Sequence, residues 1–356
     1  MPPKQGRSQN KPGFSDAPEP IGTEGKPLSM AQTGCDLNIE TTMAYGEKGA
    51  VKESNSACLL CRSKDILKVS EIQGQHLVDE WLRSFGIDVG AELGDCKVIS
   101  LLACRNCGFR YFQPSTVAGS PALYAQLCRN DWYHCGEKWE HDVALRDVEG
   151  ATKIIEIGCG SGEFIARARD EKGLSVEGLE QNPDAIERAR RRGLAVFAAD
   201  VRDLALERPA HYDVVCSFQV LEHVSEPREF LDACVALLRP GGKLLLGVPN
   251  SESFLRYQLN VLDLPPHHMS RWDAKVMNAL PGMFPLRMRA LEFEPLARNH
   301  VWSYLDAHAS RLRPRSLLGR LSRVPKLLGS LNFLVIHSGA RRLLLGHTLY
   351  VSFTRV

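Results

Sequence analysis

The sequence lacks any apolar run that approaches the roughly 18 residues needed to cross a bilayer. It also lacks a strong net charge, because 44 basic and 42 acidic side chains leave a formal charge of +2. Residues 1–12 are polar and contain no apolar core of the kind found in a signal peptide. We therefore expect a cytoplasmic protein without a membrane span and without a nucleic-acid partner.

Cysteine, by contrast, is abundant. The chain has 11 cysteines, and an odd number in an intracellular protein argues for metal ligation and free thiols. Cys58 and Cys61 form one CxxC pair, and Cys104 and Cys107 form a second. Four thiolates can hold one tetrahedral zinc, although the gap between these pairs exceeds the roughly 15 to 20 residues of a compact site. We predict a structural zinc in a module at 55–115; unmetallated core cysteines and half of a redox pair are the alternatives.

The segments on either side of this module differ in composition. Residues 1–54 are rich in Pro, Gly and Ser without apolar periodicity, which predicts a disordered tail. Residues 116–140 are unusually aromatic and predict a helical linker. Within it, Trp132 and Tyr133 either line a substrate pocket or join the two neighbouring modules.

The motif that organises the rest of the chain is a β-branched run, 153–157, followed by Gly158, Gly160 and Gly162. The run predicts a buried parallel strand, and helix-forming residues after the glycines predict a strand, glycine turn and helix in succession. A dinucleotide-binding fingerprint would need a further glycine at position 163, where Glu163 stands instead. This carboxylate disfavours a pyrophosphate and favours a cationic cofactor.

With Glu156 two residues before the first glycine, this motif resembles the first motif of class I S-adenosylmethionine (SAM) dependent methyltransferases. The resemblance extends over about 154–250. It implies that SAM is the cofactor. The residues that it assigns to the cofactor site are Glu156, Gly158, Gly160, Gly162, Glu180, Asp200, Val201 and Gln219.

Three of these residues have individual roles that the resemblance implies. Glu180 ends a predicted strand about 20 residues after the glycine turn, where a carboxylate holds the ribose hydroxyls. Asp200 would accept a hydrogen bond from the adenine amino group, and Val201 would lie against the adenine ring. The segment 218–224, which includes Gln219, matches the family's motif beside the sulfonium and the acceptor.

The regular alternation of predicted strands and helices indicates an α/β fold for residues 141–356. We expect a Rossmann-like, doubly wound sheet of seven mostly parallel strands. The family resemblance places 286–295 and 346–355 in an antiparallel hairpin at the sheet edge. Between these strands lies a basic insertion, 296–345, whose segment 311–328 is amphipathic. Peripheral membrane contact through 311–328 is less favoured than a solvated helix packed on its own domain.

The order of zinc module, aromatic linker and glycine motif resembles methyltransferases that act on sugars and other small acceptors in envelope or natural-product pathways. This resemblance implies a small-molecule acceptor, either nucleotide-linked or lipid-linked. His267 and His268, in the loop 265–272, are the predicted catalytic bases, with His223 as a further candidate. The alternative is that His267 and His268 only pack the loop.

Some quinone-pathway relatives bind a divalent metal through a Glu-x-x-Glu-His pattern. Here Gln219 occupies the first position of that pattern, which weakens a metal site and favours an acid–base or orienting role for His223. Two other classes of protein compete with the methyltransferase interpretation. One is a non-enzymatic zinc-knuckle binding module with an inert SAM fold, and the other is an NAD(P)-dependent oxidoreductase, which Glu163 disfavours.

Overall fold

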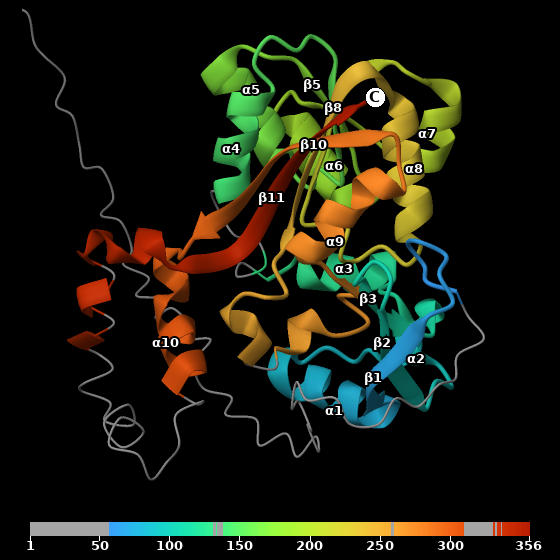
Figure 1. Cartoon of the computed structure of the whole chain (residues 1–356), viewed down its shortest axis with the longest axis vertical. Coiled ribbons are helices and arrows are strands. Elements are labelled where there is room, and N and C mark those ends of the chain that lie inside the picture. Colours follow the sequence, from blue (N-terminus) through green and yellow to red (C-terminus); the bar gives the residue numbers. More distant parts are fainter. Residues whose placement is uncertain are drawn as a thin grey trace, which may run out of the picture. The chain divides into compact units, whose positions relative to one another are not determined.

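The structure is a computed structural model that describes residues 57–130, 133, 138–257, 260–309, 330–331, 333–335 and 337–356. Its larger sheet has seven strands in the order β10-β11-β8-β7-β4-β5-β6 (Figure 1). The strands are β4 (Ile154–Ile157), β5 (Val176–Leu179), β6 (Ala195–Phe197), β7 (Tyr212–Phe218), β8 (Leu238–Pro249), β10 (Leu286–Pro295) and β11 (Leu345–Arg355).

The pairing of these strands confirms the predicted fold class. Strands β8, β7, β4, β5 and β6 run parallel to one another, and β7 is the central strand. Strands β10 and β11 form the predicted antiparallel hairpin, and β11 pairs antiparallel with β8. The hairpin therefore closes one edge of a doubly wound sheet.

Helices cover both faces of this sheet (Figure 1). They are α4 (Trp139–Asp147), α5 (Glu163–Lys172), α6 (Pro183–Arg191), α7 (Val201–Glu207), α8 (Pro227–Leu237) and α9 (Ala274–Ala279), with α10 (Val301–Ala309) in the predicted insertion. Side chains alternate across β4, so Ile154 packs with α4, α5 and α6, while Ile155 and Ile157 pack with α7, α8 and α9. Both faces are apolar, as a buried parallel sheet requires.

A second, smaller sheet is built mainly from the predicted zinc module, with the strand order β1-β2-β3-β9. Its elements are β1 (Ile66–Gln73), β2 (Val98–Cys104), β3 (Arg110–Gln113), β9 (Ser270–Arg271) and the helices α1 (Gly74–Phe85), α2 (Gly90–Leu93) and α3 (Pro121–Leu127). Helix α1 fills the gap between the CxxC pairs and ends at Gly86, which has a φ of 67°. The fourth strand, β9, comes from the histidine loop about 160 residues further along the chain.

One hydrophobic core joins the small sheet to the large one. The Phe109 ring lies 4.8 Å from that of Trp272, which follows β9, and both are fully buried. Arg228 on α8 donates to the Leu60 carbonyl oxygen between the first two cysteines. The small sheet is thus packed on the α7, α8 and α9 side of the large sheet.

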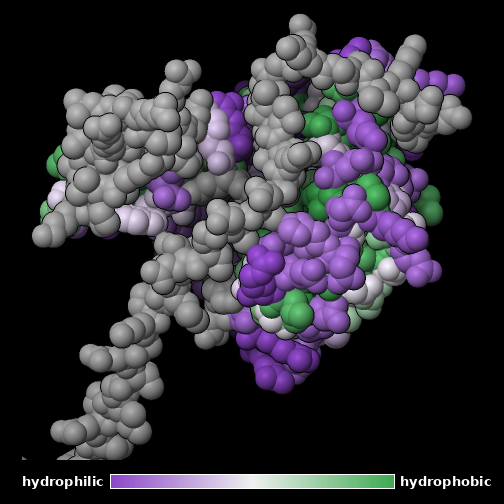
Figure 2. Space-filling model, turned by 90° about the horizontal axis from the view of Figure 1, so that it is seen from below, coloured by the Kyte–Doolittle hydropathy of each residue, from purple (hydrophilic) through white to green (hydrophobic). Residues whose placement is uncertain are grey.

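The surface at the small-sheet end is mainly hydrophilic, with separate hydrophobic areas (Figure 2). Val69, Leu82 and Val98 are the exposed large hydrophobic residues of the small-sheet region. Single exposed hydrophobic side chains of this kind are normal on the surface of a folded protein, and these three do not indicate a docking site.

Several predictions concern residues that the structure does not describe. The predicted disordered tail, Trp132 and the amphipathic segment 311–328 lie outside the described residues. Among the residues that the structure does describe, no helix is long and apolar enough to cross a membrane.

Candidate active site and metal centre

The glycine turn after β4 has a backbone that only glycine adopts readily. Gly158, Gly160 and Gly162 have φ values of 74°, 54° and 79°. A Cβ on Gly158 would lie 2.4 Å from Cγ2 of Val220, whereas a Cβ on Gly160 would meet no atom within 4 Å. The turn is therefore packed against the exit of β7 at its first glycine and leaves open space at its second.

Two carboxylates lie beside this turn. Glu156 on β4 is buried, and burial raises its pKa well above the usual value. Its Oε2 atom has no hydrogen-bond partner among the described residues. Glu180, directly after β5, accepts hydrogen bonds from the Gly160 N–H and from the N–H groups of the next two residues. A cationic ligand beside Glu156 would lower that pKa again, because a nearby positive charge favours the ionised acid.

The other predicted cofactor residues follow β6 and β7 at the same end of the sheet. Asp200 caps α7 and forms a 2.6 Å ion pair with Arg202, whose hydrogen bonds lower the pKa of Asp200. Val201 is buried in the first turn of α7. Gln219 has a φ of 58°, and its amide nitrogen donates to Glu140. The structure thus brings these three residues to the carboxyl ends of β6 and β7, at the edge of the parallel sheet where ligands bind in open α/β folds.

Glu140 is a residue of this region that the sequence motifs miss. It lies in the first turn of α4, is buried, and has a pKa raised by burial. An acid near a helix N-terminus is common, because the helix dipole favours it, so nothing in the sequence marks Glu140 as a neighbour of Gln219.

Three histidines meet at the same end of the sheet, between β7 and the loop after β8. The ring centroids of His223 and His267 are 4.5 Å apart, and those of His267 and His268 are 4.6 Å apart. One nitrogen of each ring lies within 4.8 Å of a nitrogen of both others. Burial lowers the pKa of His223 to about 4 and the pKa values of the other two well below the usual range, so all three rings are neutral at pH 7.

Each of these rings is anchored through Nδ1. His223 Nδ1 is 2.7 Å from the His267 carbonyl oxygen, and His267 Nδ1 is 2.8 Å from the Leu262 carbonyl oxygen. A carbonyl oxygen can only accept, so both Nδ1 atoms carry the proton. His268 Nδ1 lies 3.3 Å from a carboxylate oxygen of Asp263, an acid that sequence reasoning also missed.

The small sheet holds the histidine loop in place from the other side. Strand β9 pairs with β3, and the indole N–H of Trp81 on α1 donates to the Pro265 carbonyl oxygen at 3.1 Å. The Tyr124 hydroxyl on α3 donates to the His267 carbonyl oxygen, and the Tyr133 hydroxyl lies 3.0 Å from His267 Nε2. Tyr133 therefore contacts a predicted site residue directly.

Glu222, next to His223, is a buried acid that is unusually weak. Burial raises its pKa to about 8, and its side chain lies 3.8 Å from His223 Nε2. Its backbone carbonyl accepts from the N–H groups of Met269 and Ser270. Glu222 thus connects the exit of β7 to the histidine loop through main-chain hydrogen bonds.

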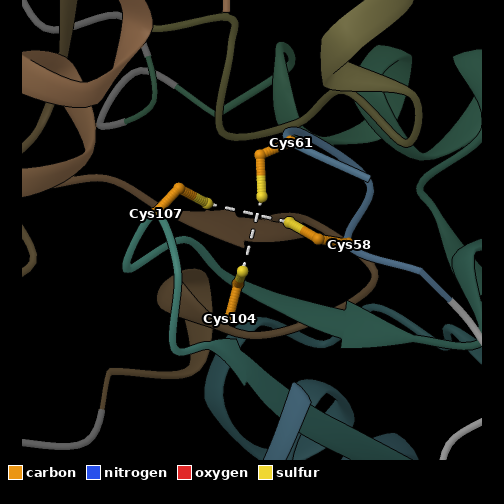
Figure 3. A group of neighbouring side chains, drawn as sticks. All are labelled: Cys58, Cys61, Cys104 and Cys107. Carbon is orange, nitrogen blue, oxygen red and sulfur yellow. Dashed lines mark hydrogen bonds between the residues drawn. The ribbon is translucent and has the colours of Figure 1, made fainter. Parts of the chain in front are cut away.

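The four cysteines of the CxxC pairs converge on one point (Figure 3). The sulfur atoms of Cys58 and Cys107 are 3.8 Å apart, and those of Cys61 and Cys104 are 3.5 Å apart. Four thiolates about 2.3 Å from a tetrahedral zinc would lie about 3.8 Å from one another. A hydrogen bond from the Cys107 thiol lowers the pKa of Cys58 to about 5, so this sulfur is already a thiolate near neutral pH. The geometry and the donor atoms therefore fit zinc.

Comparisons with known proteins agree with this arrangement. The Methyltransferase domain family matches residues 136–323, which is more than half of the chain. A ubiquinone biosynthesis O-methyltransferase of Bordetella avium is 28% identical over 164 residues, which cover 41% of this chain and 68% of the relative. One of Xylella fastidiosa is 35% identical over 114 residues, which cover 30% of this chain and 46% of the relative. The solved SAM-dependent methyltransferase of Archaeoglobus fulgidus is 17% identical with a TM-score of 0.40, over 60% of this chain and 94% of that protein.

Proposed function

This chain belongs to the methyltransferase-domain family and is a SAM-dependent enzyme, and from that premise we propose that it methylates a hydroxyl oxygen of a small acceptor held at the three histidines. One contact carries this proposal. Val220, three residues before His223, lies so close to Gly158 that no side chain fits between them. The turn assigned to the methyl donor is therefore adjacent to the segment that bears His223, whose ring centroid lies 4.5 Å from that of His267.

We assign the cofactor to the turn and the acids around it. Bound SAM supplies a methyl group made electrophilic by the positively charged sulfur. Glu156 and Glu180 would compensate the positive charges of the methionine part or bind the ribose, and the open space beside Gly160 would admit the ligand to the backbone. Asp200 and Val201 would hold the adenine, and Gln219 would lie beside the sulfonium.

The reaction needs the acceptor oxygen in line with the methyl group. A lone pair of the oxygen forms the new C–O bond while the C–S bond breaks. The electron pair of the C–S bond goes to sulfur, and the acceptor hydroxyl loses its proton. His223, His267 and His268 offer nitrogen lone pairs in a site from which most water is excluded. Because burial weakens them as bases, positioning contributes most of the rate, on the order of 7 to 11 kcal/mol for well-oriented reactants.

We also propose that Cys58, Cys61, Cys104 and Cys107 hold a structural zinc. Two observations support this zinc site. The four sulfur atoms lie within 4.8 Å of one another, and the site lies between β2, β3 and the loop that contacts Arg228. A closed four-thiolate site leaves no open coordination position and would therefore stabilise the small sheet without taking part in the reaction.

The relatives indicate which atom of the acceptor receives the methyl group. The relatives named above are O-methyltransferases, which favours oxygen over nitrogen or carbon as the acceptor atom. A sugar acceptor, a nucleotide or lipid linkage and a cytoplasmic location stay predictions from the sequence.

The function is tested with the purified full-length chain. We expect SAM to bind in calorimetry, NAD not to bind, and one methyl group to be added to at least one member of a panel of phenols, nucleotide sugars and lipid-linked sugars, followed by mass spectrometry. A protein that binds SAM but methylates no acceptor would support the inert binding module instead, and one that binds NAD but not SAM would support the oxidoreductase.

A further inference from the structure

We propose that His223, His267 and His268 form a second metal site, which binds a divalent transition metal of the zinc type. The site is separate from the four cysteines. Its existence stands on the geometry of the three rings, whereas its role in methyl transfer rests on the function proposed above.

The first support is that the ring nitrogens of the three histidines lie close together. The rings come from two separate segments, the exit of β7 and the loop after β8, yet one nitrogen from each lies within 4.8 Å of the other two. Three imidazoles about 2.0 to 2.1 Å from one zinc would bring their nitrogens to about 3.3 Å in a tetrahedral arrangement. The observed limit of 4.8 Å between the nitrogens is compatible with this spacing.

The second support is the set of groups behind the rings. Histidines that bind metals almost always donate their other N–H to a carbonyl or carboxylate, which fixes the ring and the tautomer. Two of the Nδ1 atoms face the carbonyl oxygens of His267 and Leu262, and the third faces Asp263. The Nε2 atoms are therefore the ones left with lone pairs for a metal.

A second group of possible ligands, formed by Glu294, His300 and His347, lacks this support. The Glu294 carboxylate already accepts from the backbone N–H groups of His347 and Thr348. His300 Nδ1 is buried and has no hydrogen-bond partner among the described residues, so no acceptor fixes its ring. We therefore do not propose a metal site at this group. Its residues instead provide a control substitution for the test.

Two acidic side chains lie beside the three histidines. A carboxyl oxygen of Asp263 lies 3.3 Å from His268 Nδ1, and one of Glu222 lies 3.8 Å from His223 Nε2. Imidazole donors favour zinc, copper, iron and nickel over magnesium or calcium.

One side chain opposes metal entry. The Tyr133 hydroxyl lies 3.0 Å from His267 Nε2, one of the proposed ligand atoms. It has to turn away before a metal can bind there. Replacing Tyr133 by Phe removes this competitor while keeping the ring, so the Tyr133→Phe protein should bind metal more tightly than the wild type.

A site with three protein ligands keeps a coordination position open. An acceptor hydroxyl that occupied it would lose its proton more easily, because a bound cation lowers the pKa of its oxygen ligand. The proton would pass to solvent, and the oxygen electron pair would then form the C–O bond. The histidines would in this case be ligands rather than bases.

The test uses full-length protein and Co²⁺ alone, without SAM or acceptor. Cobalt at the four cysteines gives sulfur-to-metal charge-transfer absorption, whereas cobalt at imidazoles gives only the weaker visible bands. We expect the wild type to take up one Co²⁺ of the imidazole type in addition to any ion at the cysteines, with total metal measured by plasma mass spectrometry. Absence of the imidazole-type spectrum in folded wild type would overturn the proposal.

Variants locate the ion. His267→Ala and His268→Ala should lose the imidazole-type ion, or bind it at least tenfold more weakly, while His300→Ala should retain it. Loss in His300→Ala together with retention in His267→Ala would move the metal to the other group and reject the site. Tyr133→Phe leaves all three ligands in place, so an imidazole-type affinity unchanged or weaker in that variant would also contradict the proposal.

Discussion

The two sides of the candidate site are built in different ways. The glycine turn is supported by neighbours in sequence: β4 precedes it, α5 follows it, and Glu180 is 20 residues from Gly160. The histidine loop is supported from far away, since Trp81 is 184 residues from Pro265 and Tyr124 is 143 residues from His267. The cofactor side is therefore built within the large sheet and its helices, whereas the acceptor side also depends on the tertiary packing of the small sheet.

This contrast gives the small sheet, with its proposed zinc site, a role in function. Strand β9 belongs to the histidine loop but completes the small sheet by pairing with β3. The four cysteines fix the start of β1, the end of β2 and the turn into β3. Loss of the cysteine site should therefore disturb the structure of the acceptor side more than that of the cofactor side. Each of the following substitutions compares its effects on the two sides.

The largest effect is expected from Cys104→Ser. Structural zinc contributes about 10 to 16 kcal/mol of apparent binding free energy in zinc-finger peptides, so losing it should unfold much of the small sheet. We expect loss of zinc and faster hydrogen exchange across 262–271, with less change across 156–163, measured by mass spectrometry. Cys96→Ser, outside the cluster, is the control. Full zinc content in Cys104→Ser would reject the metal assignment.

The next largest effect is expected from Gly158→Ala on the cofactor side. The new Cβ would lie 2.4 Å from Val220 on a backbone with a φ of 74°. Left-handed backbone costs roughly 1 to 2 kcal/mol and overpacking roughly 1 to 3 kcal/mol more. Calorimetry should show weaker SAM binding, and thermal melts a lower Tm. Gly173→Ala is the control, because Gly173 also has a positive φ but a Cβ there would meet no atom within 4 Å. It should lower the Tm only by the cost of the left-handed backbone. An equal loss of Tm in both variants would argue against the contact between Gly158 and Val220.

A smaller effect is expected from Glu180→Ala. The change removes a charged acceptor of three backbone N–H groups and should weaken SAM binding by roughly 1.5 to 3 kcal/mol. Hydrogen exchange at the histidine loop should stay as in the wild type. Glu187→Ala, an exposed acid on α6, serves as the matched control. SAM affinity equal to the wild type in Glu180→Ala would remove this residue from the cofactor site.

The smallest effect is expected from Tyr124→Phe on the acceptor side. It keeps the ring but removes the hydrogen bond to the His267 carbonyl oxygen, worth roughly 0.5 to 1.5 kcal/mol. We expect a lower kcat with SAM affinity unchanged, because the altered contact lies in the histidine loop. Loss of SAM affinity with unchanged kcat would contradict the separation of the two sides.

The same contrast explains what the sequence could predict. The seven-stranded sheet, its edge hairpin and the glycine turn all have contiguous patterns of apolar residues, glycines and acids. Strand β9 is only two residues long, too short to show a period. The contacts of Trp81 and Tyr124 with the histidine loop join residues far apart in sequence, and a single sequence carries no signal for such pairs.

Asp263 and Glu140 illustrate the same limit for charged residues. Each looks like an ordinary acid in a short helical segment, and only the fold shows that Asp263 faces His268 and that Glu140 faces Gln219. The cysteine pairs and His267 and His268 were recognisable because the spacing of these side chains is itself unusual.

The central claim is that the histidines serve the acceptor while the glycine turn serves the cofactor. It is tested most directly by measuring SAM affinity and turnover in His223→Ala, His267→Ala and His268→Ala, using an acceptor identified from the panel. We predict SAM affinity within a few-fold of the wild type and turnover lowered by roughly 10²- to 10⁴-fold in at least one variant. Turnover within a few-fold of the wild type in all three variants would contradict the account.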